Sequence, residues 1–339
     1  MEPILTAEDL SVSFDTPRGE LQAVRGASLA LFPGEILALV GESGCGKTTL
    51  CRTLLRLLPP NGRIKSGRVT AEGRDITRLG EREMNRLRRR LFALAPQNPM
   101  SALNPAMPVG AQIEESIRLR EPGLGRRERR WQAMELLERT GLTPTAERFR
   151  QYPRQLSGGM CQRAVLAAAL ASRPKILLAD EPATALDAAL QAQILALLRE
   201  AGRALHSAVL LVTHDLEAAA RTADRAAVMY AGKILETGGA REVFRDPRHP
   251  YTQALLRCRP ALAGPGEALP AIPGGPPDLT RPPKGDPFAC RNPWALEIDY
   301  REEPPMFPVT ETHFAASWLL DPRAPEVPAW GERGGGNER

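Results

Sequence analysis

Apolar and polar residues alternate in two short stretches near the start of the chain, at residues 4–14 and 21–31. A repeat of two residues is typical of β-strands that bury one face and expose the other. Residues 17–19 include proline and glycine, which favour a turn between the two stretches. The pattern therefore predicts a pair of antiparallel strands.

The pattern changes to a continuous apolar run at residues 36–40, which leads into a glycine-rich segment. Similar runs occupy residues 176–179 and 208–212, and residues 48–58 and 191–205 have the spacing of helices. Fully apolar strands that alternate with helices indicate a parallel sheet covered by helices on both faces. We therefore predict an α/β fold.

A long, mostly helical stretch separates the first two apolar runs and includes residues 126–139 and 162–171. It predicts an inserted helical subdomain over residues 98–172. After residue 257 the chain becomes rich in proline and glycine, which indicates a domain boundary and an extended linker. The predicted units are a main domain over residues 1–257, an extension over 258–321 and a disordered tail over 322–339.

Composition narrows the class of protein. Hydrophobic residues make up 42% of the sequence, enough to build a buried core. The longest apolar runs are far shorter than the roughly 20 residues of a membrane-spanning helix, and the first residues lack the pattern of a secretory signal. These features predict a cytoplasmic protein without a membrane span, and its five scattered cysteines predict reduced thiols.

Basic residues gather in two runs, at residues 86–90 and 126–130, although the formal net charge is only +5. Such runs are usually the solvated faces of helices. Contact with lipid headgroups or nucleic acid is the alternative, and the charge pattern alone leaves it open.

The segment Gly41-Glu42-Ser43-Gly44-Cys45-Gly46-Lys47-Thr48 has the residue types and spacing of a phosphate-binding loop. Its glycines let successive backbone N–H groups turn inward, and the predicted helix after it adds the positive end of its dipole. The motif predicts that Lys47 reaches the β- and γ-phosphates and that the Thr48 hydroxyl binds Mg²⁺. An ordinary glycine turn is disfavoured, because a strand is predicted before the loop and a helix after it.

Two adjacent carboxylates, Asp180 and Glu181, follow the apolar run at residues 176–179. Acidic residues after a strand often only form a turn. Beside a phosphate loop, however, hydrolysis needs one carboxylate to hold Mg²⁺ and another to orient the attacking water. We assign Asp180 to the metal and Glu181 to the water.

Ser157, Gly158 and Gly159 open a predicted helix that ends at residue 171. Such a helix start can bind an anion, but alone it is more often only a cap. Together, residues 156–160, the phosphate loop and the acidic strand resemble the ATP-binding subunits of ABC transporters. The resemblance implies a P-loop NTPase domain with a parallel core sheet, an antiparallel amino-terminal subdomain, an inserted helical subdomain and, here, a proline-rich carboxy-terminal extension.

The resemblance also implies roles for residues that are ambiguous when taken singly. Gln97 matches the family glutamine that contacts Mg²⁺ and water, His214 the histidine that senses the γ-phosphate, and Phe14 the ring stacked on adenine. The expected catalytic residues are Glu181, His214 and Gln97, and the expected metal ligands are Thr48, Gln97 and Asp180. The expected nucleotide-binding residues are Phe14, Gly41, Glu42, Ser43, Gly44, Cys45, Gly46, Lys47, Thr48 and Thr49.

In this family the nucleotide lies between two subunits that face head to tail. The resemblance therefore implies that some residues of one subunit act on the ATP held by the other: Ser157, Gly158, Gly159 and Asp187. Asp187 belongs to the segment Ala185-Leu186-Asp187, which matches the family loop that crosses the interface.

Residues 98–105, 248–252 and 272–274 resemble the branch of importers for oligopeptides, dipeptides and nickel. This implies a peripheral ATPase on the cytoplasmic face of the membrane that powers uptake of peptides, nickel or another small solute. The implied partners are a second, homologous ATPase subunit, two transmembrane permease subunits and an extracytoplasmic solute-binding protein, with no nucleic acid.

Some members of this branch hold an iron–sulfur cluster on four carboxy-terminal cysteines. The matching positions here are Asp286, Asn292, Asp299 and Ser317, none of which is cysteine. Since thiolates hold such clusters, we predict that none is bound.

Two other classes share parts of this motif set. A non-transport ABC ATPase that acts on nucleic acid would carry long coiled coils between the phosphate loop and the acidic strand, whereas only residues 49–175 are available here. A regulatory subunit with a decayed site would tend to lose the water-orienting carboxylate, whereas Lys47, Glu181 and His214 are all present. Both classes are therefore less well supported than a transport ATPase.

Overall fold

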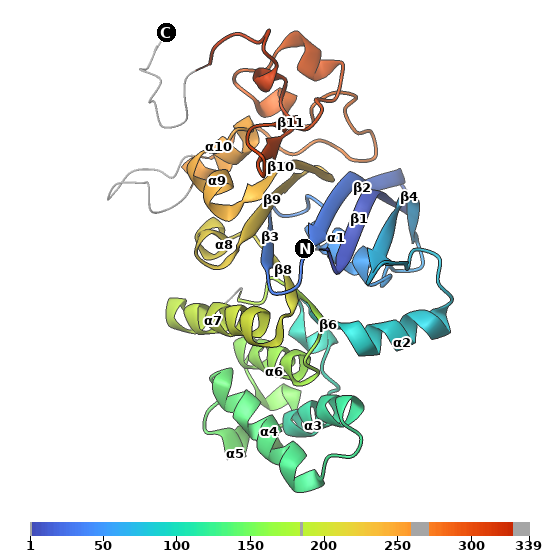
Figure 1. Ribbon diagram of the computed structural model, residues 1–339, viewed down its shortest axis with the longest axis vertical. Coiled ribbons are helices and arrows are strands. Elements are labelled where there is room, and N and C mark those ends of the chain that lie inside the picture. The colour runs from blue at the N-terminus through green and yellow to red at the C-terminus, as the bar shows by residue number, and fades with distance from the viewer. Residues whose placement is uncertain (1, 184–185, 259–270, 328–339) are drawn as a thin grey trace.

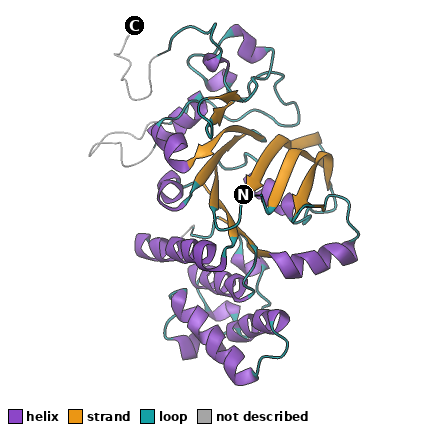
Figure 2. Cartoon of the chain, in the orientation of Figure 1, coloured by secondary structure: helices purple, strands orange, loops and turns teal. Residues whose placement is uncertain are grey.

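A computed structural model describes residues 2–183, 186–258 and 271–327. Two sheets and a group of helices make up most of this part of the chain (Figure 1, Figure 2). The strands are β1 Leu5–Thr16, β2 Gly19–Leu31, β3 Ile36–Val40, β4 Gly62–Ala71, β5 Arg74–Asp75, β6 Phe92–Ala95, β7 Ile176–Asp180, β8 Ala208–Thr213, β9 Arg225–Tyr230, β10 Lys233–Gly239, β11 Phe307–Pro308 and β12 Phe314–Ala315.

The α-helices are α1 Lys47–Leu54, α2 Glu81–Leu91, α3 Val109–Arg120, α4 Arg126–Arg139, α5 Thr145–Arg150, α6 Gly158–Ala171, α7 Ala188–Leu205, α8 Leu216–Thr222, α9 Ala240–Arg245 and α10 Pro250–Arg257. Short 3-10 helices are η1 Pro99–Ser101, η2 Pro153–Gln155, η4 Ala289–Arg291, η5 Glu297–Tyr300 and η6 Trp318–Leu320.

The smaller sheet is antiparallel and has the strand order β2-β1-β4-β5. The predicted pairing of the first two strands is confirmed, with Leu5 opposite Leu31 and Phe14 opposite Leu21. The pattern did not indicate β4, because most of its residues are exposed or half-buried and several are charged. β4 pairs with β1 and completes the sheet beside the phosphate loop.

The larger sheet has the order β11-β12-β10-β9-β3-β8-β7-β6. Strands β9, β3, β8, β7 and β6 are parallel. This confirms the parallel pairing predicted for the three apolar runs, β3, β7 and β8, whereas β6 and β9 were not predicted. All five residues of β3 are buried, since the strand lies in the middle of the sheet and both its faces are covered.

Alternate residues of β3 face two different cores. Leu37 and Leu39 pack with α1 and the antiparallel sheet, whereas Ala38 and Val40 pack with α8, α9 and α10. A third core joins the edge of the parallel sheet to α3, α4, α6 and α7. Helices α3 to α5 lie together at one end of the molecule in Figure 1, so the inserted stretch forms a helical lobe.

Three helix boundaries differ from the pattern. The helix predicted over residues 48–58 ends at Leu54, because Arg56 adopts a left-handed conformation with φ of +52°. α6 and α7 begin earlier than their apolar spacing indicates. Ser157 caps α6 and Asp187 caps α7 with side-chain oxygens, so each helix gains its first turn from a polar residue.

The C-terminal region, residues 271–327, has little regular structure, yet it packs on the main domain. Its strands β11 and β12 extend the larger sheet through β10, with Ala315 opposite Glu236. This region lies at the end of the molecule opposite the helical lobe (Figure 1). Most of the predicted tail and part of the proline-rich linker lie outside the described residues.

Candidate functional site

The predicted phosphate loop joins β3 to α1 and curves around a cavity of about 500 Å³. Its backbone needs glycine at two points. A Cβ on Gly41 would lie 2.1 Å from the Met229 carbonyl oxygen, and one on Gly46 would lie 2.4 Å from that of Ala23. Both also have positive φ angles, so the sequence allows a close turn that other residues would prevent.

Lys47 is the first residue of α1, and its side chain folds back under the loop. Its ammonium donates to the carbonyl oxygens of Gly41 at 2.7 Å and Glu42 at 2.8 Å. Gly46 caps the helix without a side-chain hydrogen bond, so the first N–H groups of α1 remain available for an anion. The loop thus offers the N–H groups and the cation that bind phosphate.

Thr48 and Asp180 come together although 132 residues separate them. The Thr48 hydroxyl donates to Asp180 Oδ1 at 3.1 Å, at the carboxyl end of β7. Burial raises the pKa of Asp180, and the hydrogen bond from Thr48 opposes that shift. A hydroxyl and a carboxylate are the hard oxygen donors that suit Mg²⁺, so these residues fit the metal that the motif implies.

Glu181 lies between two partners from neighbouring strands. Its Oε2 accepts from Gln97 Nε2 at 3.1 Å, and its Oε1 lies 3.2 Å from His214 Nδ1. These residues follow β7, β6 and β8, whose carboxyl ends meet at one edge of the sheet. Glu181 also has a φ of +52°, a conformation that is uncommon outside glycine and is found mostly at functional sites.

The cavity brings most of the predicted residues to one place. It is lined by Phe14, Leu21, Ala23, Glu42, Ser43, Gly44, Cys45, Gly46, Lys47, Thr48, Thr49, Gln97, Glu181, Tyr230, Ala231, Pro276, Pro277, Asp278 and Leu279. Phe14 lies at its wall on β1, where its ring leaves no room for a Cβ on Gly62. The last four lining residues belong to the C-terminal region, and neither periodicity nor motif indicated them.

The residues predicted to act on a partner's nucleotide lie elsewhere on the chain. Ser157 and Gly158 are exposed at the start of α6, and Asp187 is exposed at the start of α7. Within this chain Ser157 accepts from the N–H of Met160, and Asp187 accepts from the first turn of α7. None of them lines the cavity of their own chain. Ala185 lies outside the described residues.

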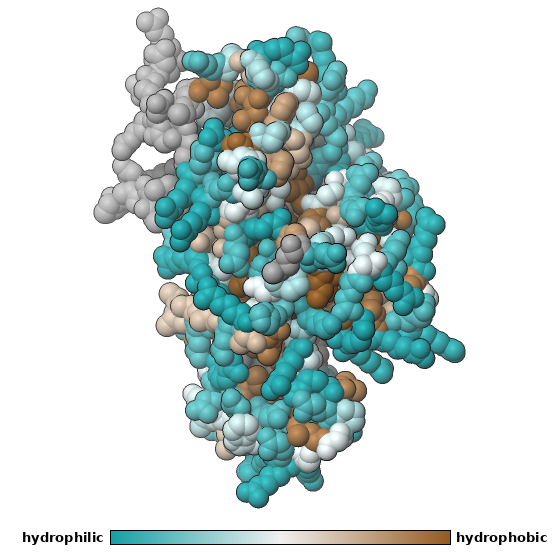
Figure 3. Space-filling view, viewed as in Figure 1, coloured by the Kyte–Doolittle hydropathy of each residue, from teal (hydrophilic) through white to brown (hydrophobic). Residues whose placement is uncertain are grey.

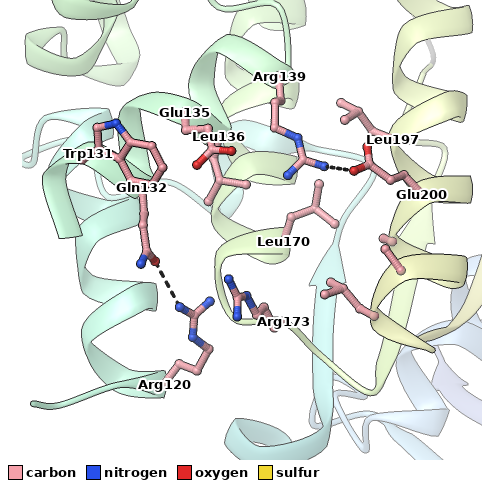
Figure 4. A pocket seen from close by; sticks show the side chains of 13 residues that line it. Arg120, Trp131, Gln132, Glu135, Leu136, Arg139, Leu170, Arg173, Leu197 and Glu200 are labelled. Carbon is pink, nitrogen blue, oxygen red and sulfur yellow. Dashed lines mark hydrogen bonds and ion pairs between the residues drawn. The ribbon is translucent and has the colours of Figure 1, made fainter. Parts of the chain in front are cut away.

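A second hollow, of about 240 Å³, lies between α4 and α7 (Figure 4). Arg139 points to Glu200 across it, at 2.8 Å, and Arg120 donates to Gln132 at 3.1 Å. None of the predicted site residues lines it. The hollow is therefore separate from the candidate site.

The four positions that match cluster cysteines are all buried in the C-terminal region. They are Asp286, Asn292, Asp299 and Ser317, and all four accept hydrogen bonds from nearby backbone N–H groups within the region: Phe288 to Asp286, Trp294 to Asn292, Leu296 to Asp299 and Leu319 to Ser317. Across the described residues no cluster of three or more His, Cys, Asp or Glu side chains has the arrangement of a metal site. That no iron–sulfur cluster is bound stays a prediction.

None of the helices in the described ranges combines the length and the hydrophobicity needed to cross a bilayer. The face drawn in Figure 3 is largely hydrophilic, with hydrophobic residues in separate small patches.

Known proteins share both the motifs and the length of this chain. The family model for the ABC transporter matches residues 24–184, and that for the oligopeptide/dipeptide transporter, C-terminal region, matches residues 235–298. The oligopeptide transport ATP-binding protein OppD of Bacillus subtilis is 48% identical over 96% of this chain and 91% of its own length. The dipeptide transport ATP-binding protein DppD of Lactococcus lactis is 44% identical over 96% of this chain and 93% of its own.

A solved structure agrees with these relatives. It is the dimeric ATP-binding cassette MJ0796 in a post-hydrolysis state bound to ADP and phosphate, and it is 26% identical with a TM-score of 0.64. The match covers 70% of this chain and 99% of that one. The predicted fold class and family resemblance are confirmed: the chain belongs to the ATP-binding subunits of the ABC transporters, in the oligopeptide/dipeptide branch.

Proposed function

We propose that this chain hydrolyses ATP to power the uptake of oligopeptides, dipeptides or a related small solute. One observation carries the proposal: Glu181 is held between Gln97 and His214 and lines the same cavity as Lys47 and Thr48 of the loop. The phosphate-binding loop and the carboxylate that orients water therefore line the same cavity. The names of the relatives in this branch supply the class of transported solute.

The phosphate loop binds the substrate, MgATP. Backbone N–H groups at the start of α1 and the Lys47 ammonium hold the phosphates, and Phe14, which lines the cavity, stacks on the adenine ring. Thr48, Gln97 and Asp180 are the residues that would hold Mg²⁺, which neutralises charge on the phosphates during transfer. The Thr48 hydroxyl and the Asp180 carboxylate already lie within hydrogen-bond distance.

Glu181 orients the attacking water and accepts its proton. Its two carboxylate oxygens are held by different partners, so the side chain cannot turn away from the cavity without losing one of them. His214 is half exposed, with a side-chain exposure of 52%, and can reach a γ-phosphate from the open side. Gln97 joins the same carboxylate to the helical lobe through the 3-10 helix η1 that follows it.

The second half of the site comes from another subunit. Ser157, Gly158 and Gly159 form the amino terminus of α6 and Asp187 that of α7, yet none of them lines the cavity of its own chain. An anion-binding helix end without a ligand in its own chain suits the nucleotide of a partner. The related cassette MJ0796 was solved as a dimer. The partner proposed here is a homologous ATPase subunit, beside two permeases and a solute-binding protein.

The test is Glu181→Gln in the complex purified with its partner subunits. This variant keeps the size of the side chain and the contact with Gln97 but cannot accept a proton, so phosphate release should fall at least about 100-fold. It should also hold an ATP-bound dimer that light scattering detects after the permeases are removed. Glu200→Gln, in the hollow between α4 and α7, is the matched control and should hydrolyse ATP like the wild type.

Two results would contradict the proposal. Undiminished phosphate release by Glu181→Gln would show that Glu181 is not needed for hydrolysis. If this variant does not dimerise with saturating MgATP in the presence of each candidate partner, two subunits do not share a nucleotide site.

A further inference from the structure

The C-terminal region returns to the phosphate loop and forms part of the cavity wall. Residues 276–279 line the cavity together with the loop. The Leu279 carbonyl oxygen accepts from the N–H of Gln22 on β2 at 3.0 Å, which fixes this segment to the antiparallel sheet. Arg25 of the same strand donates to the Pro283 carbonyl oxygen at 3.0 Å and pairs with Glu303 at 3.1 Å.

Arg291 makes the most direct link, because it contacts the loop itself. Its two terminal nitrogens donate to the two carboxylate oxygens of Glu42, at 2.8 Å and 3.1 Å. The two residues are 249 positions apart. Paired bonds of this kind between a guanidinium and a carboxylate fix both position and orientation.

The surroundings of Arg291 hold its guanidinium in one place. Nε donates to the Pro273 carbonyl oxygen at 2.9 Å, and the remaining donors reach the Tyr230 hydroxyl at 3.1 Å and the Ile272 carbonyl oxygen at 3.3 Å. With the two bonds to Glu42, all five N–H donors have acceptors. The rings of Tyr230 and Phe288 lie 5.6 Å and 5.9 Å away, and the side chain is only 5% exposed.

Glu42 is fixed at two further atoms. Its N–H donates to the Tyr251 hydroxyl at 2.9 Å, and its carbonyl oxygen accepts from the Lys47 ammonium at 2.8 Å. Its carboxylate, however, has the same sign of charge as the phosphates that the loop is built to hold. Two like charges a few ångströms apart repel strongly where water is partly excluded. Without a cation beside Glu42, the loop would oppose its own ligand.

We propose that Arg291 is a positioning residue for the phosphate loop, which neutralises Glu42 and holds it away from the phosphates. The C-terminal region is then a working part of the nucleotide site as well as an extension of the sheet. The inference rests on the proposed function, since it assumes that this loop binds MgATP.

The test measures the dissociation constant of MgATP for the full chain by isothermal titration calorimetry. Arg291→Met, which keeps much of the length but removes the charge, should weaken binding about tenfold, within the range of couplings between sites in proteins. Adding Glu42→Gln to Arg291→Met should recover part of the loss, because the like charge is removed. Arg25→Met is the matched control: it breaks another ion pair between the C-terminal region and the main domain, away from the loop, and should bind MgATP like the wild type.

The recovery separates an electrostatic role from a merely structural one, because damage to the fold would not be repaired by a second substitution. The inference is overturned if Arg291→Met binds MgATP normally, if Arg25→Met is weakened as much, or if the double variant binds no better than Arg291→Met. Should Arg291→Met not fold, Arg291→Gln decides in the same way, since it also removes the charge but keeps a polar side chain: weaker binding supports the inference and normal binding overturns it. Failure of the wild type to bind MgATP would refute the proposed function and the inference with it.

Discussion

The central sheet and the C-terminal region bury different kinds of groups. β3, β7 and β8 consist of buried residues that are almost all apolar, and titratable side chains appear only at their carboxyl ends, at Asp180, Glu181 and His214. In the C-terminal region, by contrast, many buried side chains are polar or charged: Asp286, Arg291, Asn292, Asp299, His313 and Ser317. One region is held by apolar packing and the other by directed hydrogen bonds.

This contrast follows from the backbone of each region. Parallel strands satisfy their own N–H and C=O groups, so their side chains are free to be apolar. The C-terminal region has few ladders, and side chains must satisfy its backbone instead: the N–H of Phe288 donates to Asp286 at 2.9 Å and that of Leu296 donates to Asp299 at 2.6 Å. A substitution that conserves volume should therefore be mild in the sheet and severe where polar groups are buried.

The largest loss of stability should come from substituting Glu236, which lies where β10 joins the C-terminal region. Its fully buried carboxylate accepts from His313 Nε2 at 2.7 Å and from the N–H groups of Arg248 and His249 at 2.7 Å and 3.0 Å. Glu236→Met conserves much of the volume but leaves these three donors without an acceptor. The free energy of unfolding should fall by about 3–5 kcal/mol, measured by urea denaturation.

Two companion variants sharpen this result. Leu210→Met, in the middle of β8, is also a swap of similar volume and should cost less than about 1.5 kcal/mol. Glu297→Gln removes an exposed acid of the C-terminal region and should change stability by less than about 0.5 kcal/mol. Equal losses for Glu236→Met and Leu210→Met would abolish the contrast between the two regions.

The same contrast explains which elements the sequence could predict. The strand at residues 36–40 and the helix at residues 126–139 have the predicted bounds. All five residues of the strand are buried, and this gives the continuous apolar run that marks it in the sequence. Arg56 ends α1 through a backbone conformation that no periodicity marks. The short strands β11 and β12 have two residues each and are too short for any pattern.

The residues of the candidate site show the same difference between segments that have a regular pattern and segments that do not. Glu181 and His214 each follow a predicted parallel strand, and such strands end at one edge of the sheet. The strand before Gln97, β6, was not predicted, and the roles of Gln97 and His214 came from the family resemblance. The contact of Arg291 with Glu42 could not be predicted, since it depends on the course of an irregular segment across 249 residues. Tyr251, which lies on α10 and accepts from the Glu42 N–H across 209 residues, was also missed. The roles of Ser157 and Asp187 came only from the family resemblance.

A smaller effect should appear as an unusual dependence of stability on pH. Burial raises the pKa of Asp286 to about 6 and lowers the pKa of His249 to about 4, and their side chains lie 3.8 Å apart. Between about pH 4 and 6 the folded state keeps a proton on Asp286 that the unfolded state releases, so this group lowers stability as pH rises. Between about pH 4 and 6.5 His249 stays neutral in the folded state and charged in the unfolded one, so it raises stability as pH rises.

The two contributions oppose each other, and removing one should expose the other. In Asp286→Asn the free energy of unfolding should rise by about 2 kcal/mol more than in the wild type between pH 4.5 and 6.5. In His249→Gln the free energy of unfolding should fall relative to the wild type over the same range, because the contribution of His249 is lost. The nearby charges of Lys233 and Glu236 are the same in all three proteins, so they do not affect the comparison. Urea denaturation at the two pH values measures both, and parallel curves for the three proteins would show that these groups titrate normally.

The smallest loss of stability is expected for two serines that cap helices, one in the main domain and one in the C-terminal region. Ser157 accepts from the N–H of Met160 on the exposed start of α6, and the buried Ser317 accepts from the N–H of Leu319 at the start of η6. Replacing either by alanine should cost about 1 kcal/mol of stability, because each substitution removes one cap. Only Ser157→Ala should also lower ATP hydrolysis by the assembled complex, since Ser157 is proposed to contact the nucleotide of the partner subunit. Equal hydrolysis by the two variants would show that Ser157 is only a cap, and the helix end at α6 would lose its place in the shared site.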